Sequence, residues 1–128
     1  MKILLDTHAF LWFIAGDSKL SDKAKTSIED DSNQKIVSMA SMWEMASKIS
    51  VGRLKVSEPF ELLIPRQIQI NGFELLPIQF EHVSRISSLP FHHRDPFDRL
   101  LVSQCIVEKC GIVSRDTAFD SYQVKRLW

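Results

Sequence analysis

The chain opens on Ile3-Leu4-Leu5-Asp6 and repeats this pattern near its end, at Ile112-Val113-Ser114-Arg115-Asp116. Both stretches are apolar runs of strand length that lead into an aspartate. Such runs alternate along the chain with longer segments of helical period, which is typical of β-α-β units with a parallel sheet. The sequence therefore predicts an α/β fold in which Asp6 and Asp116 lie just beyond the carboxyl ends of two strands.

The whole chain, residues 1–128, is predicted to form one domain. Its length matches the commonest domain size, and no linker or repeat divides it. The sheet is expected to be short and mostly parallel, with four to five strands and helices between them. The predicted strands are residues 2–5, 35–38, 74–78 and 112–114, with a fifth at 124–127.

The composition is that of an ordinary globular protein, with 45% hydrophobic and 25% charged residues. No window approaches the roughly 18 uncharged apolar residues of a membrane helix, and Asp6 interrupts the first apolar run before a signal-peptide core can form. We therefore expect a soluble, cytoplasmic protein. Lysine plus arginine equal aspartate plus glutamate at 16 each, so the chain lacks the overall positive charge of many nucleic-acid-binding domains. The zero net charge still permits a local basic patch, and residues 89–94 are the best candidate for it.

Four acidic residues stand just past apolar segments or at the start of predicted helices: Asp6, Glu44, Asp98 and Asp116. Ligands of an open α/β sheet bind outside the carboxyl ends of its strands, so folding can bring these distant carboxylates together. Two carboxylates about 5 Å apart repel by roughly 3 kcal/mol at an effective dielectric constant of about 20, so a cluster of four calls for a cation. Oxygen ligands favour Mg²⁺ or Mn²⁺, and phosphodiester hydrolysis is the natural use of such a site.

Single acids also have purely structural interpretations. Ser41-Met42-Trp43-Glu44 has the spacing of a capping box, which predicts a helix that begins at Ser41 and ends at Gly52. Asp95-Pro96 predicts an N-cap followed by proline at the first helical position, which puts Asp98 in a first turn where the helix dipole favours negative charge. Only the four acids together favour a site.

The other helices are predicted from their caps and apolar faces. The first begins near Thr7, and its segment Phe10–Ile14 is apolar on every face, so we expect it to lie deep in the domain or against a partner chain. Ser21 is a good N-cap for the next helix. A further helix is predicted from Ser57, with Pro65 as a kink or a restart.

The sequence contains no motif of another catalytic or binding chemistry. The four histidines show neither the H-x-x-x-H nor the H-E-x-x-H spacing of zinc sites, and Cys105 and Cys110 are predicted to be core thiols. The chain has no Walker loop, no G-x-G-x-x-G and no G-x-S-x-G, so nucleotide-binding and serine-hydrolase assignments have no basis.

Nearly the whole chain resembles the PIN-domain ribonucleases of the VapC toxin type. The matching stretches, in order, are Leu4–His8 with Trp12, Ser38–Glu44 with Lys48, Gly52–Leu54, Leu89-Pro90, His93–Leu101, Ser114–Asp116, Tyr122 and Leu127-Trp128. The resemblance implies a three-layer α/β/α PIN-like fold and Mg²⁺- or Mn²⁺-dependent endonucleolytic cleavage of RNA. It also implies a small antitoxin protein that blocks the groove, and a homodimer, which agrees with the apolar first helix.

The same resemblance assigns roles to individual residues. It implies that Asp6, Glu44 and Asp98 position a first ion, and that Asp116 completes its shell or helps to hold a second one. Hydroxyl groups beside the site would come from Thr7 and Ser114. Candidates for contacts with RNA phosphates, each of which is also readily explained as an ordinary surface cation, are Lys48, Arg94, Arg99 and Arg115.

Two other functions remain open. A receiver-type phosphoacceptor domain is also a doubly wound sheet with acids at strand ends, but it needs adjacent acids after the first strand, where Asp6 stands alone. A catalytically silent module that uses the fold only to bind a partner is the second alternative, although all four acids are present.

Overall fold

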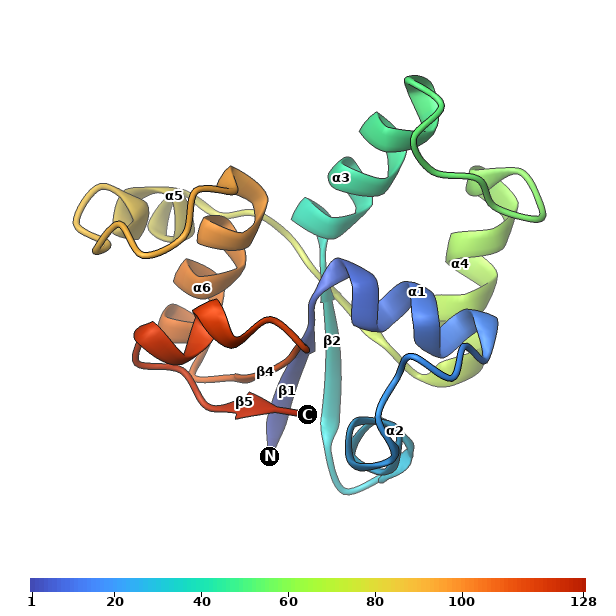
Figure 1. Ribbon diagram of the computed structural model, residues 1–128, viewed down its shortest axis with the longest axis horizontal. Helices are drawn as coiled ribbons and strands as arrows, with labels where there is room; N and C mark the ends of the chain where they lie inside the picture. The colour runs from blue at the N-terminus through green and yellow to red at the C-terminus, as the bar shows by residue number, and fades with distance from the viewer.

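The computed structural model describes all 128 residues as a five-stranded parallel sheet with helices on both faces (Figure 1). The strands lie in the order β3-β2-β1-β4-β5. Their bounds are β1 Lys2–Leu5, β2 Gln34–Ser38, β3 Glu74–Leu76, β4 Gly111–Val113 and β5 Arg126–Leu127. The helices are α1 Thr7–Ala15, α2 Asp22–Glu29, α3 Met39–Ser50, α4 Phe60–Asn71, α5 Phe80–Ile86 and α6 Pro96–Glu108, with a 3₁₀ helix η1 at Thr117–Ser121.

The two faces of the sheet carry two separate hydrophobic clusters. Successive side chains of a strand point to opposite faces, so Ile3 and Leu5 of β1 enter one cluster and Leu4 enters the other. Helices α1, α2 and α4 cover the first face, whereas α6 and η1 cover the second. Both faces are buried, which explains why the central strands are apolar without alternation. The predicted three-layer α/β/α fold is therefore confirmed.

All five predicted strands form, with small differences at their ends. Strand β3 stops at Leu76 instead of residue 78, because Pro77 has no N–H to continue the ladder. Strand β5 consists of Arg126 and Leu127 alone. The sheet is fully parallel, as the pairings of β1 with β2 and β4 show.

Two predicted helix starts are wrong. Helix α3 begins at Met39 because Ser38, the last residue of β2, caps it by accepting a hydrogen bond from the Ala40 N–H at 3.0 Å. Ser41 and Glu44 therefore form no capping box. Helix α4 begins at Phe60 rather than Ser57 and continues through Pro65. The caps at Ser21 and Asp95 and the left-handed Gly52 after α3 are confirmed.

Helix α1 owes its apolar sequence largely to packing inside the domain. Ala9 and Phe10 are fully buried, and Leu11, Trp12, Phe13 and Ile14 are half-buried against the same cluster. The helix ends at Gly16, whose φ of 64° is a left-handed conformation that favours glycine. This packing accounts for the helix without a partner chain.

The chain enters the sheet at its centre and builds outward twice, first to β2 and β3 and then to β4 and β5. Such a reversal creates a crevice at the carboxyl ends of the central strands, where open α/β sheets bind ligands. The strand order also excludes the receiver alternative, because flavodoxin-like receiver domains have the order 2-1-3-4-5. None of the helices combines the length and the apolar character that a bilayer span demands.

Candidate metal centre

The four acids arrive at the crevice from four different segments. Asp6 directly follows β1 and caps α1, with its Oδ1 accepting the Ala9 N–H at 2.8 Å. Glu44 lies in the second turn of α3, and Asp98 lies in the first turn of α6. Asp116 follows β4 and caps η1. The structure therefore brings together carboxylates that are up to 110 residues apart in sequence.

Asp6, Glu44 and Asp98 form a group of like charges in which Asp6 and Glu44 are buried and Asp98 is half-buried. Asp6 and Glu44 are 7% and 4% exposed. Burial raises the pKa of Asp6, and the nearby charge of Glu44 adds to the increase. Burial, followed by the charge of Asp95, raises the pKa of Asp98 to about 7, with smaller contributions from Asp6 and Glu44. The charge of Glu44 thus acts on Asp6, and the charges of Asp6 and Glu44 act on Asp98.

Glu44 is held by two neighbours. Its Oε1 accepts a hydrogen bond from the Thr7 hydroxyl at 2.7 Å, and its Oε2 accepts one from the Lys48 ammonium at 2.7 Å. The Thr7 Oγ1 also lies 3.0 Å from the Ser41 Oγ. These contacts hold the Glu44 carboxylate in place and put the Thr7 hydroxyl in direct contact with one of the four predicted acids.

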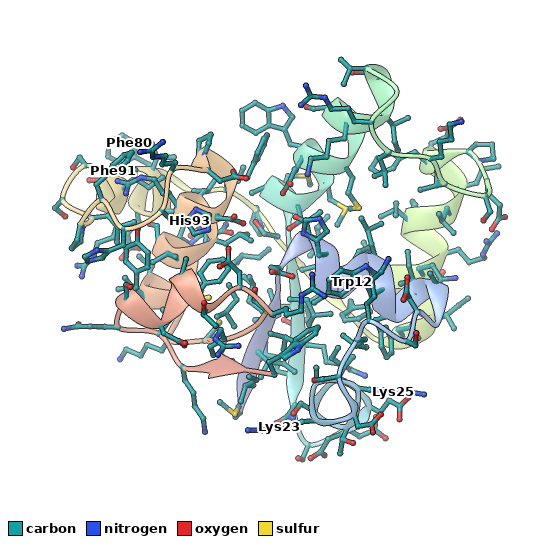
Figure 2. All side chains as sticks on the ribbon, in the orientation of Figure 1. Trp12, Lys23, Lys25, Phe80, Phe91 and His93 are labelled. Carbon is teal, nitrogen blue, oxygen red and sulfur yellow. The ribbon has the colours of Figure 1, made fainter.

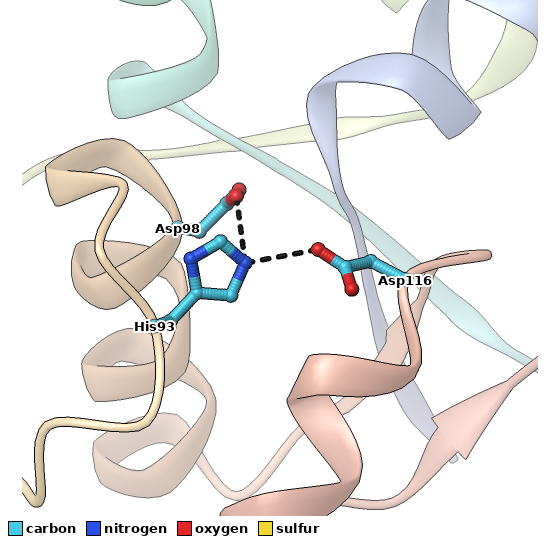
Figure 3. A group of neighbouring side chains, drawn as sticks. All are labelled: His93, Asp98 and Asp116. Carbon is cyan, nitrogen blue, oxygen red and sulfur yellow. Dashed lines mark hydrogen bonds and ion pairs between the residues drawn. The ribbon is translucent and has the colours of Figure 1, made fainter.

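His93 joins the other two acids across the crevice (Figure 3). Its Nε2 lies 2.9 Å from the Asp116 Oδ2 and 3.2 Å from the Asp98 Oδ2. Its Nδ1 accepts the Asp95 backbone N–H at 3.3 Å, so Nε2 is the protonated nitrogen and donates to the carboxylates. Partial burial alone would raise the pKa of Asp116, but hydrogen bonds from the Ala118 N–H and from His93 hold it below its ordinary value.

The sequence analysis missed His93 because no ligand spacing marks it. Loop residues 87–95 between α5 and α6 carry it, and its signals in the sequence were its place in the matching stretch His93–Leu101 and its position two residues before the Asp95 N-cap of α6. Ser114, in contrast, was anticipated. It is fully buried just after β4, lowers the pKa of the nearby Asp6 carboxyl group, and accepts the Asp116 N–H at 3.0 Å.

The four cations expected at RNA phosphates differ in their surroundings. Lys48 pairs with Glu44, Arg94 is exposed in the loop before α6, and Arg115 is exposed over the Trp12 ring at 5.0 Å. Arg99 is buried and donates to the carbonyl oxygens of Pro90 at 3.1 Å and Leu89 at 3.4 Å. The Arg99 guanidinium therefore binds carbonyl oxygens of the loop before α6, which is a different contact from the expected one with an RNA phosphate.

The residues of the crevice fit a hard divalent cation. Asp6 and Asp98 carry an energetic cost of burial and mutual repulsion that a cation between them removes. Carboxylate oxygens of Asp98 and Asp116 lie within 4.8 Å of each other with the protonated His93 Nε2 between them, so the two acids are the potential ligands of this group. A set dominated by carboxylate oxygens suits Mg²⁺ or Mn²⁺.

Sequence comparison gives the family. The family model of the PIN domain matches residues 3–125. The chain belongs to the PIN domain family. A comparison with curated proteins finds no significant match.

Solved structures share the fold of this PIN domain at low sequence identity. VapBC2 of Rickettsia felis bound to a promoter DNA fragment has a TM-score of 0.70 at 15% identity, and all of both chains is covered. FitAcB of Neisseria gonorrhoeae has a TM-score of 0.58 at 19% identity over 97% of this chain and 95% of the other. A toxin-antitoxin complex of Klebsiella pneumoniae has a TM-score of 0.60 at 15% identity over 90% and 87%.

Two hollows of the PIN domain adjoin the acids. The larger, here called the large groove, has a volume of about 720 Å³ beside α1 and the segment after α3, and its walls contain Lys48, Arg53 and Lys55 but no acidic residue. The smaller, called the acid-side pocket, has a volume of about 290 Å³. It is lined by Asp6, His8, Trp12, Arg115 and Asp116. His8 and Trp12 separate the two hollows because they line both.

Proposed function

We propose that this PIN domain is a divalent-metal-dependent endoribonuclease and the toxin of a toxin-antitoxin pair. The observation that supports this most strongly is the gathering of Asp6, Glu44, Asp98 and Asp116 at the carboxyl ends of β1 and β4. Asp6 and Asp98, whose pKa values are raised by burial and by neighbouring negative charge, are poorly suited to a purely structural role and well suited to hold a cation.

The proposed chemistry divides between the cation and the protein. When bound, Mg²⁺ or Mn²⁺ would supply Lewis-acid polarisation of the scissile phosphate and a water of lowered pKa. Asp6, Asp98 and Asp116 would hold the ion, while Thr7 and Lys48 keep Glu44 aimed at the same point. Ser114 lies beside Asp6 and favours its charged form. The exposed cations Arg94 and Arg115 contact phosphates on either side of the cleaved bond.

The toxin role is supported by the relatives of known structure, two of which are the VapBC2 complex of Rickettsia felis and a toxin-antitoxin complex of Klebsiella pneumoniae. We propose that the antitoxin segment lies in the large groove. Apolar walls with Lys48, Arg53 and Lys55 fit an apolar segment that carries acidic side chains. We expect the protein to bind both that segment and its RNA substrate in the cytoplasm. A homodimer of this chain would leave the crevice of each copy accessible.

The test of the nuclease is cleavage of single-stranded RNA with Mn²⁺, with and without EDTA. We expect the wild-type protein to cleave only without the chelator, and Asp6→Asn and Asp98→Asn to lose cleavage by at least 100-fold while they remain folded. Asp120→Asn is the matched control, since Asp120 pairs with Arg126 outside the acid group. Equal cleavage by all four proteins contradicts the assignment, and folded, RNA-binding wild-type protein without cleavage would instead support the silent module.

The toxin role has a separate test. Expression of the wild-type chain alone should arrest growth of a bacterial host, and Asp98→Asn should not. Unhindered growth with cleavage-active protein in the cell contradicts the toxin role and leaves the nuclease proposal intact.

A further inference from the structure

We infer that the acid-side pocket binds the base of a nucleotide next to the cleaved bond, stacked on a platform made by Trp12 and Arg115. This inference rests on the proposed nuclease function and names part of its substrate site. The occupant is one base of a single-stranded RNA.

The acid-side pocket directly adjoins the proposed metal site. Asp6 and Asp116, two of the four clustered acids, form part of its wall. A phosphate held at those acids therefore puts its attached nucleoside at the pocket mouth. The volume of about 290 Å³ is at the lower limit of small-molecule pockets, which suits one base rather than a larger group.

Trp12 is a rigid surface. It is half-buried on α1, packs against the hydrophobic cluster of α1, α2 and α4, and lies with its ring centroid 5.9 Å from that of Trp128. His8, one turn earlier on α1, lies 5.6 Å away at an interplanar angle of 38°. An aromatic ring that is already fixed in place loses little conformational freedom when a base stacks on it.

Arg115 completes the platform. Its guanidinium lies 5.0 Å over the Trp12 ring, is exposed, and has no carboxylate partner among the ion pairs of the protein. Unstacked RNA bases are bound on aromatic rings and on arginine planes, and this stacking tolerates any base because every base has a π face.

The charges of the pocket favour a base over a free anion. Asp6 and Asp116 repel a phosphate that arrives without a cation, whereas a neutral planar base can stack on the Arg115 guanidinium that Trp12 supports and meet polar atoms at its edge. The pocket should therefore add affinity for single-stranded RNA with little base preference.

The experiment is a double-mutant cycle between Trp12 and the RNA bases. Binding of a labelled single-stranded RNA of about ten nucleotides to Asp98→Asn protein is followed by fluorescence anisotropy, and each base of the RNA is removed in turn. We expect one abasic position to weaken binding about tenfold. Adding Trp12→Leu should weaken binding of the intact RNA about tenfold and abolish the sensitivity to that one position.

Two further variants make the result specific. Arg115→Lys keeps the positive charge but loses the plane, and it should also lose the sensitivity to the abasic position. Trp12→Phe keeps a stacking surface and should retain that sensitivity, which separates stacking from folding defects. Phe80→Leu is the control, because Phe80 is an 85% exposed aromatic residue at the start of α5, far from Trp12 (Figure 2). It should change nothing.

Trp12→Leu protein that binds every RNA like its parent overturns the inference, and so does a loss that is equal at all abasic positions. If wild-type protein still cleaves RNA in an Mn²⁺-dependent manner, such a result leaves the nuclease proposal standing. Absence of RNA binding by both Asp98→Asn and wild-type protein contradicts the nuclease proposal and this inference together.

Discussion

Asp98 is the residue with the strongest conflict between burial and charge. Its pKa of about 7 arises from burial and from the neighbouring Asp95, Asp6 and Glu44. The folded protein therefore retains the Asp98 proton up to about pH 7, whereas an unfolded aspartate releases it near pH 4. Ionisation of this carboxyl group costs stability as the pH rises through that window, because the native state binds more protons than the unfolded state.

Asp98→Asn should accordingly stabilise the protein in EDTA. We expect the free energy of unfolding to rise by about 2 kcal/mol at pH 8 and the difference to shrink toward pH 4. Thermal unfolding across this pH range measures it. Addition of Mn²⁺ should raise the Tm of the wild type and not that of the variant. A variant that is less stable than the wild type at pH 8 would show that burial of Asp98 carries no such cost.

Thr7 acts through Glu44. Thr7→Val keeps the shape of the side chain but removes the hydroxyl that donates to the Glu44 Oε1 at 2.7 Å. Loss of a hydrogen bond that orients a metal ligand typically costs 10- to 100-fold in affinity, so we expect Mn²⁺ affinity to fall about tenfold. Calorimetric titration with Mn²⁺ measures it, with Thr7→Ser as the control that should bind like the wild type. An unchanged Mn²⁺ affinity of Thr7→Val would contradict a role of Thr7 in orienting Glu44.

Among single residues, the sequence predicted the position of those that directly follow a strand. Asp6 and Asp116 could be placed because the end of an apolar run fixes where the next side chain lies. The capping-box interpretation of Glu44 was wrong because Ser38, at the end of β2, supplies the cap of α3. His93 could not be found, because a loop conformation and a contact with Asp116, 23 residues away, leave no local pattern.

Among the elements, the loop between α5 and α6 depends on one buried cation. Arg99 donates to the carbonyl oxygens of Pro90, Leu89 and, at 3.5 Å, Ile86, and its guanidinium lies 4.4 Å from the Phe91 ring centroid. The guanidinium thereby satisfies the carbonyl oxygens of Leu89 and Pro90, which accept no backbone hydrogen bond. The loop also carries His93, so Arg99 influences the site through the backbone.

Arg99→Lys should therefore destabilise the fold without a direct effect on RNA binding. Lysine keeps the charge but cannot reach several carbonyl groups at once, so we expect a loss of about 1–2 kcal/mol in the free energy of unfolding by urea. RNA affinity of the folded variant should stay within about twofold of the wild type. Unchanged stability with clearly weaker RNA binding would restore the phosphate contact suggested by the sequence.

Elements were predicted better than their ends. Apolar runs predicted every strand, and the caps Ser21 and Asp95 predicted helices α2 and α6. The start of α4 was misplaced because Ser57 and Pro59 both resemble helix starts, and only tertiary packing of Leu63 and Ile64 decides between them. Pro65 is tolerated within α4, which the local rule did not foresee.

For the whole molecule, a net charge of zero makes RNA binding depend on few cations. With phosphate contacts from Lys48, Arg94 and Arg115, log K should fall with log salt with a slope of about −2, since each contact to a single strand contributes about −0.7. Arg94→Gln should make the slope shallower by about 0.7. Lys25→Gln, on α2 away from the crevice (Figure 2), is the matched control and should leave it unchanged. Equal slopes for all three proteins would exclude Arg94 from the RNA site.

The parallel topology could be predicted because its alternating pattern repeats along the whole chain, and the convergence of the acids followed from it. The two hollows could not, since their walls combine α1, the segment after α3 and the loop after β4. Their shapes depend on side-chain packing between elements, which the periodicity of one segment does not encode.

The central claim is that Asp6, Glu44, Asp98 and Asp116 gather around a divalent cation. A crystal structure of the wild-type protein soaked in Mn²⁺, with anomalous diffraction to locate the metal, tests it most directly. We predict a strong anomalous peak in the crevice at the carboxyl ends of β1 and β4, within about 2.5 Å of carboxylate oxygens of Asp6 and Asp98, and no such peak in Asp98→Asn crystals. A peak elsewhere, or an empty crevice at saturating Mn²⁺, would contradict the account.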